Sequence, residues 1–140
     1  MSAPRRVVLD ASALLAWVLN ERGAHTIGKL LPVAVIPAPN LVEVLYRAPE
    51  RGHRMTASRL QEHALAMGLT VEPFTARDVA RAAELIAYSR ANRRDAQGDC
   101  LSLGDGVGLA VAERLELPIT GGDQLWAALP LNVQFMPFRR

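Results

Sequence analysis

The stretch VVLDASALLAWVL, residues 7–19, is the clearest indication of fold class in this chain. Its first three residues are continuously apolar and include two β-branched valines, which is typical of a buried parallel strand. Asp10 ends this run, and residues 11–19 have the pattern of a helix. A buried strand that leads directly into a helix is the repeating unit of α/β proteins, so the stretch predicts a parallel sheet with helices packed against it.

The rest of the chain repeats this alternation of strand and helix. Further strands are expected at residues 33–36, 69–71, 117–120 and 133–136. Helices are expected at residues 24–31, from a cap at Asn40 to Ala48, at residues 56–67, from a cap at Thr75 to Ser89, and at residues 102–115 and 123–129. Residues 90–99 have no apolar period and are expected to form a loop. The pattern predicts an α/β fold, a three-layer α/β/α sandwich around a central parallel sheet of roughly four to five strands.

Length and composition limit the class of protein further. The chain has 140 residues, half of them apolar, which suits one domain spanning residues 1–140. Asp10 interrupts the first apolar run before a signal peptide could form, and no run reaches membrane-spanning length. Cys100 is the only cysteine, so an internal disulfide and a multi-cysteine metal site are excluded. We therefore expect a soluble, cytoplasmic protein that makes no contact with a membrane.

Four acidic residues fall where expected strands end or helices begin: Asp10, Glu43, Asp105 and Asp123. The carboxyl ends of parallel strands open into one crevice, so these side chains are expected to meet there. Clustered carboxylates repel one another and raise each other's pKa values unless a cation neutralises them. Mg²⁺ prefers oxygen ligands and binds through carboxylates together with substrate phosphates, so the cluster points to phosphodiester chemistry.

Each acid taken alone also has a structural explanation. Asp10 could simply cap the helix that follows it, and Asp123, which follows two glycines in a turn, could cap the last short helix. Two more acids fit the capping box, in which a cap residue and the acid three residues later bind each other's backbone amides. The two pairs are Asn40 with Glu43, and Ser102 with Asp105. Only the presence of four acids at one edge of the sheet favours a cation over these explanations.

The basic residues suit a polyanionic substrate. The net charge is +2, and fifteen of the sixteen basic residues are arginine, the side chain best adapted to bidentate phosphate contacts. Arg90, Arg93 and Arg94 lie in the expected loop and are candidates for contacts to the phosphates of such a substrate, with a solvated loop as the alternative. Asp99, in the same loop, is a candidate outer-sphere ligand of a metal.

Three segments carry a resemblance to a known family: VLDASALLAWVLNERG (8–23), PNLVEVLYR (39–47) and LSLGDGVGLAVAERLELPITGGDQLW (101–126). In order and spacing they resemble the VapC-type toxins of the PIN-domain superfamily. The resemblance implies an α/β/α sandwich, a Mg²⁺- or Mn²⁺-dependent endoribonuclease, a homodimer, and inhibition by a cognate VapB-type antitoxin. It places the family's acidic quartet on Asp10, Glu43, Asp105 and Asp123, with Ser12 beside the first acid.

The chain departs from the family's pattern at two places. The family often has a hydroxyl residue two positions before its last acid, where this chain has Gly121, and Thr120 lies one residue earlier. Thr120 is therefore only a candidate accessory residue. Gly106 stands where the family often has a bulkier residue, frequently arginine, so no basic contact is expected at that point.

Two other classes of function remain open on the sequence. A receiver-like signalling domain also gathers acids around Mg²⁺, but it needs a lysine partner, and the only lysine here is Lys29, in an early helix. A catalytically weak PIN-like module that binds RNA or protein would keep the fold without cleaving RNA. Metal-dependent cleavage of RNA distinguishes a nuclease from both.

Overall fold

A five-stranded, fully parallel sheet forms the centre of the molecule. The computed structural model describes residues 6–92, 100–121, 126 and 129–139. The strands are β1 (Val7–Leu9), β2 (Ala34–Pro37), β3 (Thr70–Glu72), β4 (Ile119–Gly121) and β5 (Phe135–Pro137). Their order in the sheet is β3-β2-β1-β4-β5, so β1 lies in the middle and β4 is its neighbour on one side.

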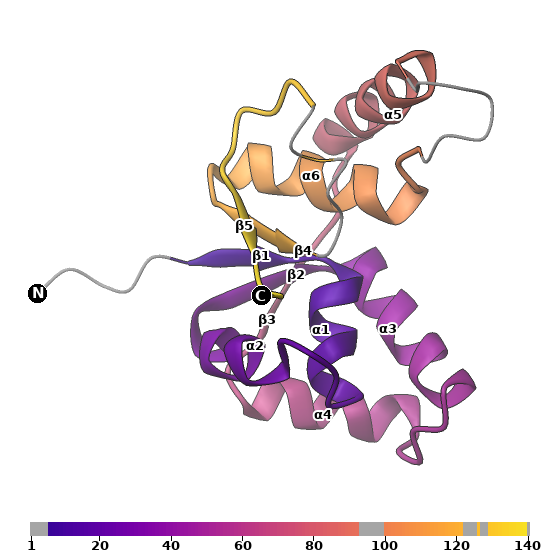
Figure 1. The fold of residues 1–140 in the computed structure, drawn as a ribbon, viewed down its shortest axis with the longest axis vertical. Helices are drawn as coiled ribbons and strands as arrows, with labels where there is room; N and C mark the ends of the chain where they lie inside the picture. The colour runs from indigo at the N-terminus through magenta and orange to yellow at the C-terminus, as the bar shows by residue number, and fades with distance from the viewer. Residues whose placement is uncertain (1–5, 93–99, 122–125, 127–128, 140) are drawn as a thin grey trace, which may run out of the picture.

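Helices cover both faces of this sheet (Figure 1). One face carries α1 (Ala11–Val18), α2 (Ala24–Leu30), the short 3₁₀ helix η1 (Leu31–Val33), α3 (Ala38–Glu50) and α4 (Ala57–Ala66). The other face carries α5 (Ala76–Ala91) and α6 (Leu103–Leu115). The predicted fold class, a three-layer α/β/α sandwich with a parallel sheet, is confirmed. Among the helices in the described ranges, none is long and apolar enough to cross a membrane.

The side chains of β1 alternate between two hydrophobic cores. Val7 and Leu9 pack into the core formed with α1 to α4, whereas Val8 packs with Ile119 into the core formed with α5 and α6. All three are at most 2% exposed. A strand buried on both faces explains why VVL is continuously apolar instead of alternating. Asp10 follows at the point where this apolar run leaves the sheet.

Ion pairs join α5 to α6, the helix that carries Asp105. Arg114 donates to the buried carboxylate of Asp78 at 2.7 Å and to Glu72 at 3.1 Å. Burial alone would raise the pKa of Asp78, but the hydrogen bonds from Arg114 and Thr75 outweigh it, and this pKa is lowered. The pairs hold α6 in one position beside the sheet.

The start of α3 differs from the prediction. The helix begins at Ala38, with Pro37 as its N-cap, so Asn40 is the third residue of the helix and the predicted cap at Asn40 is wrong. Pro39 fits the first turn, where its missing N–H is not needed, and this allows the helix to begin three residues earlier than expected. The helix also continues through Pro49 to Glu50. Elsewhere the predicted boundaries of described elements shift by one or two residues, and most of the predicted helix 123–129 lies outside the described residues.

Candidate functional site

Three of the four predicted acids line one cavity of about 130 Å³. Asp10 comes from the end of β1, Glu43 from α3, which follows β2, and Asp105 from the first turn of α6. These segments are distant in the sequence. The adjacent, parallel strands β1 and β2 bring Asp10 and Glu43 together, and the hydrogen bond from Asn40 of α3 to the Gly104 carbonyl places the start of α6 beside them. Asp123 lies outside the described residues. The cavity is also lined by Ala11, Ser12, Asn40, Arg47, Ser102 and Gly104.

Asp10 is buried in this site, and hydrogen bonds fix the orientation of its carboxylate. It is the N-cap of α1 and only 4% exposed, and its Oδ1 accepts a hydrogen bond from the Ala13 amide at 2.8 Å. The Ser12 hydroxyl lies within hydrogen-bond distance of both carboxylate oxygens, at 2.8 and 2.9 Å. The predicted capping role of Asp10 is therefore confirmed, and capping also fixes the direction of its carboxylate.

The pKa of Asp10 is raised from 3.8 to about 7. Burial is the main cause, because a carboxylate removed from water is destabilised relative to the neutral acid. The hydrogen bonds from Ala13 and Ser12 oppose the rise, and the negative charges of Asp105 and Glu43 add to it. The sequence predicted a raised pKa from repulsion between the acids; the direction agrees, but burial contributes more than repulsion.

Glu43 forms an ion pair within its own helix. Its Oε2 lies 2.7 Å from Nη1 of Arg47, one turn further along α3, and the two side chains are 26% and 46% exposed. This pair replaces the capping box that the sequence offered for Glu43, which is wrong because Asn40 is inside the helix. An exposed i,i+4 pair contributes only about 0.3–0.5 kcal/mol, so a stronger cation can take Glu43 from Arg47 at little cost.

Asp105 and Ser102 form the predicted capping box at the start of α6. The Ser102 amide donates to Oδ2 of Asp105 at 3.0 Å, and the Asp105 amide donates to the Ser102 hydroxyl at 3.1 Å. The box anchors the Asp105 carboxylate at the cavity. Capping and a role at the site are therefore compatible for this residue.

Two residues of the cavity were missed by the sequence analysis. Arg47 could have been found, because a basic residue four positions after Glu43 on a helix is a standard ion-pair spacing. Asn40 was misread as a cap. In the structure it is 1% exposed and donates from Nδ2 to the Gly104 carbonyl at 3.0 Å, which ties α3 to α6. Its Oδ1 is buried and receives no hydrogen bond from the described residues, which costs about 1–3 kcal/mol for a polar atom without a partner.

Thr120 and Gly121 lie on opposite sides of β4. Thr120 is 1% exposed, and its backbone carbonyl accepts from the Asp10 amide at 3.1 Å. Because Ile119 faces α6, the alternation of the strand directs the Thr120 side chain toward the opposite face, away from that core. Gly121 instead lies against Asp10 and Trp126. Within the described structure Thr120 is not one of the cavity's lining residues, and its accessory role stays a prediction.

Of the remaining residues that the sequence analysis singled out, the structure describes Gly106 and Arg90. Gly106 is buried against α5, where an added Cβ would lie 2.6 Å from Cδ1 of Ile86, so close helix packing explains the glycine. Arg90 lies in the last turn of α5 and is exposed, outside the carboxylate cavity. Arg93, Arg94 and Asp99 fall outside the described residues.

The three carboxylates line one cavity, but their oxygens are not arranged around a common position for a metal ion. Among the described residues, no three Asp, Glu, His or Cys side chains are arranged to hold a metal ion as they stand. Glu43 is paired with Arg47, and a cation would have to displace this pair to take the carboxylate. The oxygen donors nonetheless fit a hard divalent cation by their chemistry.

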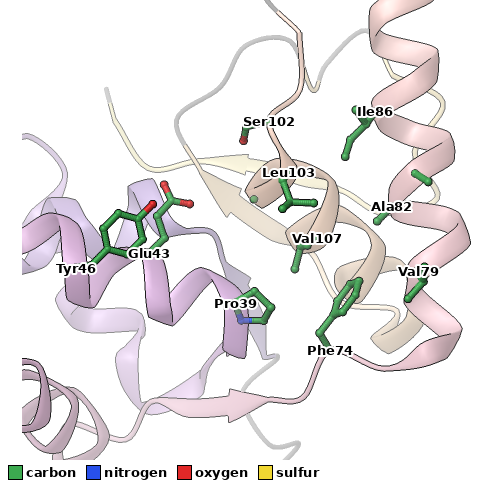
Figure 2. Close-up of a pocket in the computed structure, with 12 residues that line it drawn as sticks. Pro39, Glu43, Tyr46, Phe74, Val79, Ala82, Ile86, Ser102, Leu103 and Val107 are labelled. Carbon is green, nitrogen blue, oxygen red and sulfur yellow. The ribbon is translucent and has the colours of Figure 1, made fainter.

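An apolar groove of about 720 Å³ adjoins the carboxylate cavity (Figure 2). Figure 2 shows Tyr46 and Glu43 of α3 on one side and Val79 and Ile86 of α5 on the other, with Leu103 of α6 between them. Leu103 is 74% exposed and Tyr46 56%, which is unusual for large apolar side chains gathered in one place. Glu43, Ser102 and Gly104 line both the groove and the cavity, so the two are continuous.

The fold and the site together define a class of protein: a parallel α/β/α sandwich that collects carboxylates at the ends of its central strands. A family model described as PIN domain matches residues 7–127. The match covers most of the chain, which therefore belongs to the PIN domain family. The PIN-domain part of the family resemblance drawn from the sequence is confirmed.

Solved structures agree with this fold assignment. A toxin-antitoxin complex from Klebsiella pneumoniae matches with a TM-score of 0.66 and 17% identity, over 89% of this chain and 92% of that one. VapC20 of Mycobacterium tuberculosis, described as a sarcin-ricin loop cleaving toxin, matches with a TM-score of 0.64 and 19% identity, over 87% and 94%. DNA-bound VapBC from Salmonella typhimurium matches with a TM-score of 0.68 and 13% identity, over 96% and 99%. A comparison with curated proteins finds no match.

Proposed function

We propose that this protein is a metal-dependent endoribonuclease that acts as the toxin of a type II toxin-antitoxin pair. The observation that carries the proposal is the cavity in which Asp10, Glu43 and Asp105 meet at the end of a parallel sheet. Folding alone does not require three acids at one place, one of them buried, because their charges repel. A bound cation would neutralise these charges and so offset their repulsion.

The donor set suits Mg²⁺ or Mn²⁺, which prefer oxygen ligands. Asp10, Glu43 and Asp105 would hold the ion, with Asp123 as the fourth acid. When bound, such an ion polarises the scissile phosphate and lowers the pKa of the attacking water.

The protein's own residues orient these ligands. Ser12 and the Ala13 amide fix the carboxylate of Asp10, and Ser102 fixes that of Asp105. Gly104 leaves room for Glu43, because an added Cβ would lie 2.8 Å from Oε1 of Glu43. Ligands held in place before the reaction lose less freedom when it occurs, which favours catalysis.

RNA is the proposed substrate. The site belongs to a PIN domain, and one structure of similar fold is described as a toxin that cleaves the sarcin-ricin loop. Arg47 lies at the cavity and could contact a phosphate once a cation has taken Glu43. Arg90, Arg93 and Arg94 remain candidate contacts to the RNA backbone.

A cognate VapB-type antitoxin is the proposed inhibitor, and a homodimer the proposed assembly. Several structures of similar fold are toxin-antitoxin or VapBC complexes. The antitoxin would place an arginine or lysine among the carboxylates, in competition with the metal. The pairing of Arg47 with Glu43 supports this, because a guanidinium already binds one of these acids. The apolar groove would receive the antitoxin's apolar side chains, since it opens directly into the cavity.

Incubation of the purified protein with total RNA tests the proposal. We expect cleavage with Mg²⁺ or Mn²⁺, none with a chelator, and recovery when the metal is restored. The antitoxin should inhibit cleavage less strongly at higher Mg²⁺ and constant ionic strength, because the two compete for the same acids. RNA binding without cleavage at any metal concentration would instead indicate a PIN-like binding module.

A further inference from the structure

Asn40 occupies the junction of the three segments that carry the acids. It lies one turn before Glu43 on α3, and its Nδ2 donates to the carbonyl of Gly104, the residue before Asp105. The residue is 1% exposed and lines the carboxylate cavity. One side chain thus links the helix of Glu43 to the first turn of the helix of Asp105.

Two glycines of α6 lie beside this side chain. A Cβ added at Gly104 or at Gly108 would lie 3.7 Å from Nδ2 of Asn40 in either case. The two glycines are four residues apart, so they lie on the same face of the helix. A Cβ at Gly108 would also lie 3.9 Å from Cβ of Asp10, so Asn40 and Asp10 both lie beside this glycine.

The side-chain oxygen of Asn40 has no hydrogen-bond partner among the described residues. Oδ1 of Asn40 is buried and accepts no hydrogen bond from any residue in the described ranges. An apolar residue of similar shape would avoid the cost of burying this oxygen, and helix packing alone would favour it. The oxygen belongs to a residue that lines the cavity of the carboxylates, where a cation and its water would be.

We propose that Asn40 is a positioning residue of this cation site: its Nδ2 fixes the first turn of α6 against α3, and its Oδ1 accepts a hydrogen bond from water in the hydration shell of the cation. Mg²⁺ and Mn²⁺ bound by a few carboxylates keep several waters, and each water is a donor. Residues that orient ligands from outside the coordination shell typically change metal affinity by about 10–100-fold when they are lost. This inference rests on the proposed function, because it presupposes that the carboxylates bind a cation.

Mn²⁺ binding by the full-length protein tests the inference. Calorimetric titration with MnCl₂ would compare the wild type with Asn40→Leu, which keeps the branched shape, and with Asn40→Ala, which adds no bulk. Val44→Ala is the control, because Val44 lies one turn further along the same helix, is fully buried, and has no polar side-chain atom. Thermal unfolding of each metal-free variant shows which of them fold.

We expect both Asn40 variants to bind Mn²⁺ at least about 10-fold more weakly than the wild type. Val44→Ala should lose stability in the metal-free form and keep its Mn²⁺ affinity within about 2-fold, as expected of a purely structural residue. Unchanged Mn²⁺ affinity in whichever Asn40 variant folds would overturn the role of Asn40 and leave the cation site standing. An equal loss of affinity in Val44→Ala would also overturn it. A wild type that binds no Mn²⁺ would overturn the proposed function itself.

Discussion

Gly121 lies against the carboxylate of Asp10, so closely that a Cβ at this position would be 2.6 Å from Oδ2. The same Cβ would be 2.4 Å from Cη2 of Trp126, which is itself 1% exposed. The departure from the family's hydroxyl pattern at this position therefore has a local cause. Glycine leaves room here for both the buried tryptophan and the carboxylate of Asp10, and burial is the main cause of the raised pKa of that acid.

Gly121→Ala should therefore disturb both the fold and the site. We expect the free energy of unfolding to fall by about 1–3 kcal/mol, as for other overpacked cores, and Mn²⁺ affinity to fall with it. Gly108→Ala is the matched control, because its Cβ would meet only ordinary contacts, the nearest at 3.5 Å. It should change stability by less than about 1 kcal/mol, since alanine favours a helix interior. Urea unfolding of the two variants checks this, and equal effects would contradict the account.

The raised pKa of Asp10 makes the stability of the metal-free protein depend on pH. Between 3.8 and about 7 the folded protein holds a proton on Asp10 that the unfolded chain has released. The contribution of Asp10 to stability is therefore complete below this window and is lost as pH rises through it, by at most about 1.4 kcal/mol per pH unit.

Urea unfolding of the wild type and of Asp10→Asn across this window measures the effect. The variant cannot titrate at this position, so the difference between the two curves isolates Asp10 from other groups. Saturating Mn²⁺ should remove most of the dependence in the wild type, because the metal binds the ionised form. Parallel curves for wild type and variant would show that Asp10 does not titrate in this range.

Arg47 is expected to compete with the metal for Glu43. Arg47→Gln should raise Mn²⁺ affinity by about 2-fold or more, which corresponds to the small free energy of an exposed i,i+4 pair. Arg51→Gln is the control, since Arg51 has the same 46% exposure but pairs with Glu21. It removes the same formal charge and should leave Mn²⁺ affinity almost unchanged. A lower affinity in Arg47→Gln would mean that Arg47 supports the site instead of competing for it.

Much of the fold could be predicted because local patterns and tertiary structure agree. The strand at VVL and the helices with clear apolar periods were found because burial on a sheet or a helix face imposes that spacing. The prediction of where α3 begins was wrong because two local preferences compete there. Asparagine is favoured at a cap, but Pro37 and Pro39 also fit the start of a helix. Asn40 instead became a buried residue that contacts Gly104, 64 positions away.

The candidate site could be predicted only in part, for a related reason. The acids could be named because parallel strands bring their carboxyl ends together, which is a property of the fold class. The residues that orient them depend on long-range contacts that have no local pattern. The close approach of Gly121 to Asp10 and the position of Asn40 between two glycines of α6 are of this kind. Arg47 is the exception, because its spacing from Glu43 was visible in the sequence.

The most direct test of the central claim compares RNA cleavage by the wild type and by Asp10→Asn at saturating Mg²⁺. The substitution keeps the shape of the side chain and removes the charge that the metal needs, so the variant should still fold, as circular dichroism can show. We predict that its cleavage rate falls by more than about 100-fold, beyond the usual effect of losing a residue outside the coordination shell. Undiminished Mg²⁺-dependent cleavage by the folded variant would contradict the assignment of a metal-dependent nuclease site to this cavity.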